Sequence, residues 1–287
     1  MSTIMKLGVS IFPCSYTIPP AELAVALEER GFESLWLAEH SHIPVGRTAP
    51  WPGGPVLPQM YYDTMDPFVC LSAAAAVTTE LKLATGIALV VQRDPIHLAK
   101  LVTSIDVLSG GRFLFGVGAG WGFEEMANHG TDHEMRFGLM RERVEAMKEI
   151  WASEQAEYHG EQVDFDPIFQ NPKPVQKPHP PIHVGGVMPG GLKRAVRYGN
   201  GWIPIAGRGE FNPSAWLTAR DEECERAGRD PAEVEVSVYG APHDRAVVEQ
   251  ARALGVDRLV FGLPPDGADV VLPILDKLAD LADLGQV

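Results

Sequence analysis

The residue best suited to proton chemistry is His40, which stands two residues after the short apolar stretch 34–38. An imidazole titrates near neutral pH, so a histidine at a strand end can accept a proton from a bound molecule, donate one to it or polarise it. Glu39, Ser41 and His42 add polar groups beside it. His40 is therefore the predicted catalytic residue, although a histidine that only satisfies a hydrogen bond at a sheet end would give the same pattern. His40 and His42 alternate along an extended chain and face opposite sides, so we predict no metal site.

Two groups of glycines stand directly after predicted strands. The first group is Gly118 and Gly120, with Ala119 between them, and the second group is Gly185 and Gly186. Backbone N–H groups that no side chain shields suit a planar or phosphorylated ligand, so these glycines predict a cofactor site. The alternative for the first segment is that Gly116 and Gly118 only relieve crowding in a tightly packed barrel. The sequence alone leaves both explanations open.

The segment GVGAGWG at 116–122 is superficially similar to a dinucleotide fingerprint. A GxGxxG pattern that starts at Gly116 needs a glycine at Trp121, and one that starts at Gly118 needs a glycine at Phe123. The segment therefore gives little support to a Rossmann dinucleotide site.

The elements that position these residues alternate regularly between strand and helix. The central unit is an apolar strand over 83–91, interrupted at Gly86, then a helix over 95–108 and a second strand over 112–117. Such parallel units are right-handed and collect their chemistry beyond the carboxyl ends of the strands. Eight strands are predicted, at 4–11, 34–38, 83–91, 112–117, 182–184, 201–205, 233–238 and 257–261. This alternation predicts an α/β fold with one (β/α)8 barrel domain over 1–287, with a doubly wound sheet as the rival.

Two irregular segments interrupt the alternation. Residues 41–64, after the second strand, hold five prolines and a glycine pair, and a loop of this length in a compact domain is usually functional. We interpret it as a lid over the site. Residues 152–181, before the fifth strand, are also rich in proline, and we expect a short hairpin around 158–165 there.

Composition excludes several classes of protein. The 24 basic and 38 acidic residues give a net charge of −14, which would repel a phosphate backbone, so no nucleic acid partner is expected. No segment approaches the length of a membrane span, and the N-terminus is typical of a first strand, not of a signal peptide. Three widely separated cysteines form neither a disulfide framework nor a zinc motif. These features favour a cytoplasmic location.

The chain resembles a known family in four segments, which are Arg30–His40, Leu83–Trp121, Pro172–Gly186 and Gly255–Phe261. These segments follow one another in the matching order, and the family that they resemble is the luciferase-like monooxygenase superfamily. Within it, the chain looks most similar to the actinobacterial F420-dependent oxidoreductases. The resemblance spans nearly the whole chain. It is specific for the superfamily and less specific for the cofactor.

The resemblance implies a TIM barrel, usually a homodimer, that binds F420 or a flavin at the carboxyl ends of its strands. It places His40 near the reactive face of the deazaflavin and implies a cis peptide bond at Gly86-Ile87 that backs the ring. The cofactor contacts that we predict are His40, Gly86, Ile87, Leu89, Gly118, Ala119, Gly120, Trp121, Gly185 and Gly186.

The chain also departs from the sugar-phosphate dehydrogenases of this superfamily. Trp121 stands where those relatives carry an acidic proton donor, and Pro44 where they carry a tryptophan. The short segment 239–242 predicts a pocket that is open, or closed by loop 41–64 or by a partner subunit. We therefore predict hydride transfer between F420 and a small organic substrate other than a sugar phosphate. The alternatives are an FMN-dependent two-component monooxygenase and a flavin-binding protein without turnover.

Overall fold

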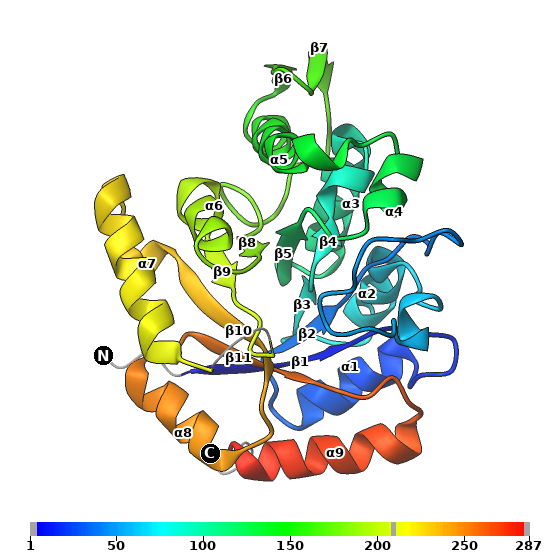
Figure 1. The fold of residues 1–287 in the computed structure, drawn as a ribbon, viewed down its shortest axis with the longest axis vertical. Helices are drawn as coiled ribbons and strands as arrows, with labels where there is room; N and C mark the ends of the chain where they lie inside the picture. The colour runs from blue at the N-terminus through cyan, green and yellow to red at the C-terminus, as the bar shows by residue number, and fades with distance from the viewer. Residues whose placement is uncertain (1–4, 208–210, 284–287) are drawn as a thin grey trace.

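Parallel strands close into a barrel, as predicted (Figure 1). The computed structural model describes residues 5–207 and 211–283. Neighbouring strands pair in the order β3-β2-β1-β11-β10-β9-β8-β5-β4, and pairing of β3 with β5 completes the circle. The barrel strands are β1 (Lys6–Ile11), β2 (Ser34–Leu37), β3 (Lys82–Thr85), β4 (Ala88–Leu89), β5 (Phe113–Gly118), β8 (Ile182–Gly185), β9 (Gly201–Ile203), β10 (Glu235–Ala241) and β11 (Arg258–Gly262). Strands β3 and β4 share one of eight positions in the wall, so the (β/α)8 prediction is confirmed.

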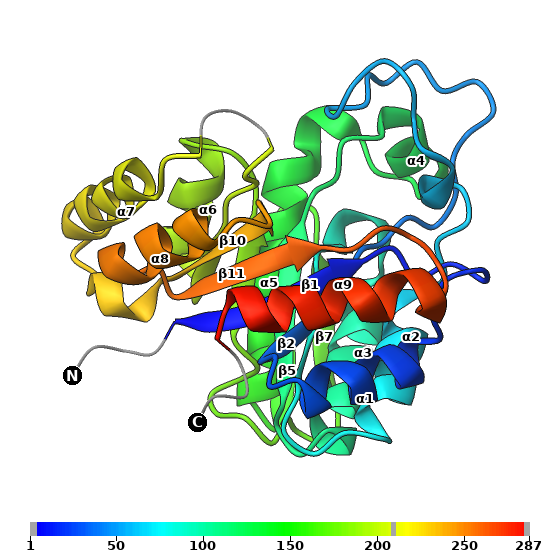
Figure 2. The same cartoon turned by 90° about the horizontal axis from the view of Figure 1, so that it is seen from below.

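Helices surround the strands (Figures 1 and 2). They are α1 (Pro20–Glu29), α2 (Pro67–Ala75), α3 (Pro95–Leu108), α4 (Phe123–Asn128), α5 (Arg136–Ala152), α6 (Gly190–Tyr198), α7 (Pro213–Ala227), α8 (Arg245–Leu254) and α9 (Ala268–Leu281). Single 3-10 turns occur as η1 (Gln59–Tyr61), η2 (Val90–Gln92), η3 (His133–Met135) and η4 (Pro231–Glu233). Asp66 and Asp94 begin α2 and α3 as N-caps followed by proline. No helix in the described part of the chain is long and apolar enough to span a bilayer.

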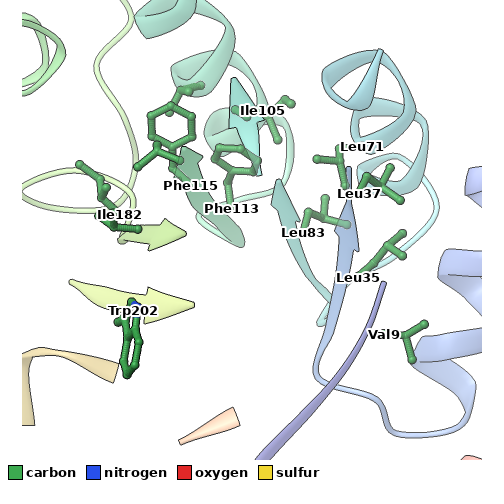
Figure 3. Close-up of a cluster of buried hydrophobic side chains, with 14 of the residues drawn as sticks. Val9, Leu35, Leu37, Leu71, Leu83, Ile105, Phe113, Phe115, Ile182 and Trp202 are labelled. Atoms are coloured by element: carbon green, nitrogen blue, oxygen red, sulfur yellow. The ribbon is translucent and has the colours of Figure 1, made fainter. Parts of the chain in front are cut away.

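The main hydrophobic core lies between the strands and the helices. Alternate residues of each strand point outward to it, such as Leu35 and Leu37 of β2, which lie near Leu71 of α2 (Figure 3). Trp36, between them, points into the barrel and packs with Leu114, Ile203 and Val260. This alternation fixes which residues of a strand can reach the barrel interior.

A buried ionic cluster lies beside this inner layer. Arg258 is bound by Glu33 and Glu235, with N···O distances of 2.9 and 3.0 Å, and its guanidinium lies 5.6 Å from the centre of the Trp36 ring. His183 is fully buried beside Glu235, at 3.8 Å. Burial and the charge of Arg258 lower the pKa of His183 to about 4, so its imidazole is neutral near pH 7.

The strand predicted over 83–91 is interrupted at Gly86, as predicted, and it ends earlier than predicted, at Leu89. It breaks between β3 and β4, where the peptide bond Gly86-Ile87 is cis, and residues 90–92 form the 3-10 turn η2. A Cβ atom on Gly86 would lie 2.8 Å from the Tyr239 ring and 3.2 Å from Trp36 Cβ. These buried neighbours leave no room for an ordinary side chain, so a regular strand with a residue other than glycine cannot pass this point.

Other boundaries agree with prediction to within a few residues. The hairpin expected around 158–165 is formed by β6 (Gln155–His159) and β7 (Asp164–Phe169), which pair antiparallel and project beyond α5 (Figure 1). The predicted first strand begins at Ile4 and the predicted last helix ends at Leu284, and both of these end residues lie outside the described residues. The short helix α4 was not predicted.

Candidate active site

A cavity of about 360 Å³ opens at the carboxyl ends of the strands, within the size range of small-molecule sites. Every residue predicted to contact a cofactor lines it: His40, Gly86, Ile87, Leu89, Gly118, Ala119, Gly120, Trp121, Gly185 and Gly186. They come from strands far apart in the sequence, which the barrel brings to one rim. The structure confirms that these residues lie together, and their role toward a cofactor stays a prediction.

Different neighbours exclude a side chain at the individual glycines of the site. A Cβ atom on Gly116 would lie 1.9 Å from the carbonyl oxygen of Thr85. The barrel wall therefore leaves no room for a side chain at this position. A Cβ atom on Gly118 would lie 2.4 Å from Ile87 Cδ1, and one on Gly185 would lie 3.0 Å from Ile87 Cγ2. Both residues line the cavity and make room for Ile87. Crowding therefore explains Gly116, whereas Gly118 and Gly185 are crowded by Ile87 and also line the cavity.

His40 lies at the end of β2, with only 9% of its surface exposed. Its Nδ1 atom lies 2.9 Å from Oε2 of Glu125 in α4. The ring also packs against Tyr61 and Trp121, with centroid distances of 5.1 and 5.6 Å. Because Nδ1 is engaged by Glu125, Nε2 is the nitrogen left to serve a molecule in the cavity.

Glu125, which contacts the predicted catalytic residue, was not predicted from the sequence. Burial alone would raise the pKa of its carboxyl, but hydrogen bonds from His40 and from the Ser41 backbone N–H outweigh burial and hold the pKa below its ordinary value. An ionised carboxylate only accepts hydrogen bonds, so Nδ1 of His40 carries the hydrogen and Nε2 of the neutral ring is a proton acceptor. Two adjacent carboxylates, Glu124 and Glu125, after a glycine-rich strand end were the available signal.

Glu39 binds neighbouring protein groups and does not contact His40 through its carboxylate. Its carboxylate accepts hydrogen bonds from the backbone N–H of Leu89, at 2.6 Å, and from Nε of Arg93, also at 2.6 Å. It therefore fixes the position of β4, immediately after the break at Gly86. Arg93 also pairs with Asp66, so neither Glu39 nor Arg93 is free for a ligand.

Loop 41–64, which we interpret as a lid, reaches the His40 end of the cavity. Its residue Tyr61 lines the cavity. Oε1 of Glu124 in α4 accepts hydrogen bonds from the backbone N–H and the hydroxyl of Thr48, each at 2.6 Å, and from the backbone N–H of Ala49 at 3.2 Å. The loop runs beside α4 in both views (Figures 1 and 2). Glu124 thus ties the loop to α4.

Arg194 in α6 also lines the cavity and was not predicted to do so. Its guanidinium stacks 4.0 Å from the centre of the Phe137 ring, and its Nε atom is buried without a hydrogen-bond partner. It forms no ion pair with any described residue. Gly186 is adjacent, since a Cβ atom there would lie 3.4 Å from an Arg194 terminal nitrogen. An unpartnered guanidinium beside exposed backbone suits an anionic group.

No group of three or more histidine, cysteine, aspartate or glutamate side chains in the described residues is arranged to hold a metal ion. The polar groups of the site are suited to protons and anions.

Comparison with known proteins identifies the family. The model of the luciferase-like monooxygenase family matches residues 19–274. The chain belongs to this family. As a luciferase-like protein it shares 38% identity over 281 residues with the uncharacterized protein Rv0953c of Mycobacterium tuberculosis, covering 96% of this chain and 98% of the relative. The fold also matches the crystal structure of monooxygenase RslO1 from Streptomyces bottropensis, with a TM-score of 0.77, 21% identity and coverage of 96% and 98%.

Named relatives of this luciferase-like chain differ in cofactor. The F420-dependent glucose-6-phosphate dehydrogenase of Kineococcus radiotolerans is 29% identical over 76% of this chain and 61% of its own length. The FMNH2-dependent dimethylsulfone monooxygenase of Pseudomonas putida is 33% identical over 40% of this chain and 32% of its own length. Family membership thus supports an oxidoreductase and leaves F420 and FMN as the candidates.

Proposed function

We propose that this protein transfers a hydride between the deazaflavin coenzyme F420 and a small organic substrate. The observation that carries the proposal is that His40, oriented by Glu125, lies in the same cavity as the cis bond Gly86-Ile87 and the strand-end glycines. An acid–base group and a shielded flat surface are what hydride transfer needs from a protein when the redox chemistry belongs to a coenzyme.

The residues present fit such a coenzyme. Gly118 and Gly185 make room for Ile87, and together these three residues give the cavity an apolar wall that suits a planar ring. The buried, unpartnered Nε of Arg194 next to Gly186 suits the anionic tail that F420 and FMN both carry. When bound, F420 supplies a carrier for one hydride.

Side chains of the protein transfer the proton, and loop 41–64 excludes water. Nε2 of His40 accepts the proton of a substrate hydroxyl, or returns it to a carbonyl oxygen in the reverse direction. The carboxylate of Glu125 stabilises the imidazolium that forms. Loop 41–64, held by Glu124, excludes water from this end of the cavity and so strengthens these interactions.

An FMN-dependent monooxygenase is the second candidate, because Arg194 would serve the phosphate of FMN equally well and a relative is named for FMNH2. A flavin-binding protein without turnover is the third. Titration of the purified protein with F420 and with FMN, followed by coenzyme fluorescence, separates the first two. Tight binding of F420 supports the proposal, and tight binding of FMN with no binding of F420 would overturn it.

A screen of F420 reduction and of reduced F420 oxidation against alcohols, ketones and enones tests the third candidate. Turnover with any of them supports an enzyme. Bound F420 with no turnover in either direction would favour a carrier.

Two further expectations belong to the same proposal. The family resemblance implies a homodimer, which light scattering on the purified protein tests directly. A cytoplasmic location is proposed because Cys14, Cys70 and Cys224 are all unpaired and buried, which suits a reducing compartment.

A further inference from the structure

The two ends of the cavity differ in chemistry. The end beside Gly186 presents the guanidinium of Arg194. The end beside His40 is aromatic: Phe12 and Tyr61 lie 4.5 Å apart by ring centroids, and Tyr61 and Trp121 lie 6.2 Å apart. Arg194 would hold the anionic tail of the proposed coenzyme at the first end, which would leave the second end for the substrate.

The aromatic end holds no charge that is free to bind a ligand in the described part of the chain. Glu39 is bound to Arg93 and to the Leu89 backbone. The guanidinium of Arg47, on the lid, lies 5.6 Å from the centre of the Trp121 ring and donates to the carbonyl of Ala49, and it does not line the cavity.

Phosphate or carboxylate groups would be poorly solvated at this end. Burying an ionised group costs several kcal/mol unless a cation or several donors meet it, and the Phe12, Tyr61 and Trp121 rings offer apolar faces instead. A flat or alicyclic apolar body, by contrast, gains both burial and ring contacts there.

We infer that the substrate is an uncharged, ring-bearing molecule with one hydroxyl or carbonyl group, bound with that group at Nε2 of His40 and its apolar body against Phe12, Tyr61 and Trp121. The inference rests on the proposed function, because it assigns the Arg194 end to the coenzyme. It separates this chain from relatives named for glucose 6-phosphate.

The test is calorimetric titration of the full chain, with and without the coenzyme that the fluorescence titration identifies. The probes are 1-indanol, 1-indanone and cyclohexanol, which are uncharged, and glucose 6-phosphate, which is charged. We expect the uncharged probes to bind and glucose 6-phosphate not to bind. Binding of glucose 6-phosphate at least as tight as that of 1-indanol, or no binding of any uncharged probe, would overturn the inference.

Variants then locate the probe. Tyr61→Ala removes a ring from the aromatic end and should weaken 1-indanol binding about tenfold, whereas Tyr61→Phe should restore it to within about twofold. Phe169→Ala, which removes an exposed ring on the hairpin strand β7, is the matched control and should change nothing. Unchanged 1-indanol binding in Tyr61→Ala would also overturn the inference.

Failure of the inference and failure of the proposed function give different results. A protein that binds neither F420 nor FMN but still binds 1-indanol through Tyr61 contradicts the proposed function alone. A protein that binds coenzyme and prefers glucose 6-phosphate contradicts the substrate class alone.

Discussion

Nδ1 of His40 and Oε2 of Glu125 lie 2.9 Å apart, although 85 residues separate them in the sequence. The carboxylate fixes which nitrogen of the ring carries the hydrogen. The tautomer and the orientation of the His40 ring therefore depend on a residue of another element.

Glu125→Gln should reduce the ability of His40 to act as an acid–base group while the other side chains of the site stay in place. A glutamine can donate to Nδ1 as well as accept from it, so the tautomer is no longer fixed, and we expect turnover to fall by about 100-fold or more. Nitrogen-15 NMR of labelled histidine reports the tautomer directly: we expect hydrogen at Nδ1 in the native protein and a mixture in the variant.

Glu124→Gln is the matched control for that experiment, because its carboxylate binds the lid and not His40. An unchanged His40 tautomer is expected there. If both variants changed the tautomer equally, His40 would not depend on its contact with Glu125.

Glu124→Gln should also loosen the lid. Its carboxylate accepts three hydrogen bonds from Thr48 and Ala49, and we expect amide exchange over 41–64 to become about tenfold faster when charge-assisted bonds are lost. Glu134→Gln, at an exposed carboxylate of η3, is the control. Equal exchange in native protein and Glu124→Gln would mean that other contacts hold the lid.

The lid contact should persist in mild acid. Hydrogen bonds from Thr48 lower the pKa of Glu124 from 4.5 to about 2. A lowered folded-state pKa contributes stability that is present above the unfolded value and lost as pH falls through the folded value. Protection of 41–64 is therefore expected to be the same at pH 5 as at pH 7, and to disappear only near pH 2.

Gly118→Ala should mainly weaken coenzyme binding, whereas Gly116→Ala should mainly lower the free energy of unfolding. The new Cβ at 118 meets the end of the Ile87 side chain, which must shift into the cavity, so we expect coenzyme affinity to fall about tenfold or more with a modest loss of stability. The new Cβ at 116 meets the backbone carbonyl of Thr85, so we expect about 3 kcal/mol or more of lost unfolding free energy. Urea unfolding and coenzyme titration of both variants measure the difference, and identical behaviour would refute it.

His183 should make the fold sensitive to acid. Its pKa is about 4 in the folded state and near 6.5 when exposed, so the unfolded chain binds the proton first as pH falls, and stability declines from about pH 6.5 to pH 4. The free energy of unfolding should drop by about 2 kcal/mol between about pH 7 and pH 5 from this group. His183→Gln should flatten that part of the profile, and replacement of the exposed His159 should not. A native profile that is already flat over this range would contradict the assignment.

The fold and the membership of the site were predictable for the same reason. Parallel strands end at one rim, so a histidine after the second strand and glycines after the fourth and fifth had to approach one another, as His40, Gly118 and Gly185 do. What the sequence did not reveal depends on contacts between distant elements. Helix α4 has only six residues, too few for a periodic signal, so Glu125 was overlooked.

Two other residues show the same limit. Arg194 looks like a surface cation, because nothing in the sequence shows that α6 turns it toward the cavity. The side chains of Trp36 and Tyr239, from other strands, crowd Gly86. The interruption at Gly86 was predictable from the sequence, whereas these two contacts were not.

The attachment of the base and of the lid to separate carboxylates of α4 makes this chain a candidate for loop grafting. His40 is tied through Glu125, and residues 48–49 are tied through Glu124. A library that exchanges the segment beyond Ala49 and keeps both glutamates should alter which molecules are accepted without moving the imidazole of His40.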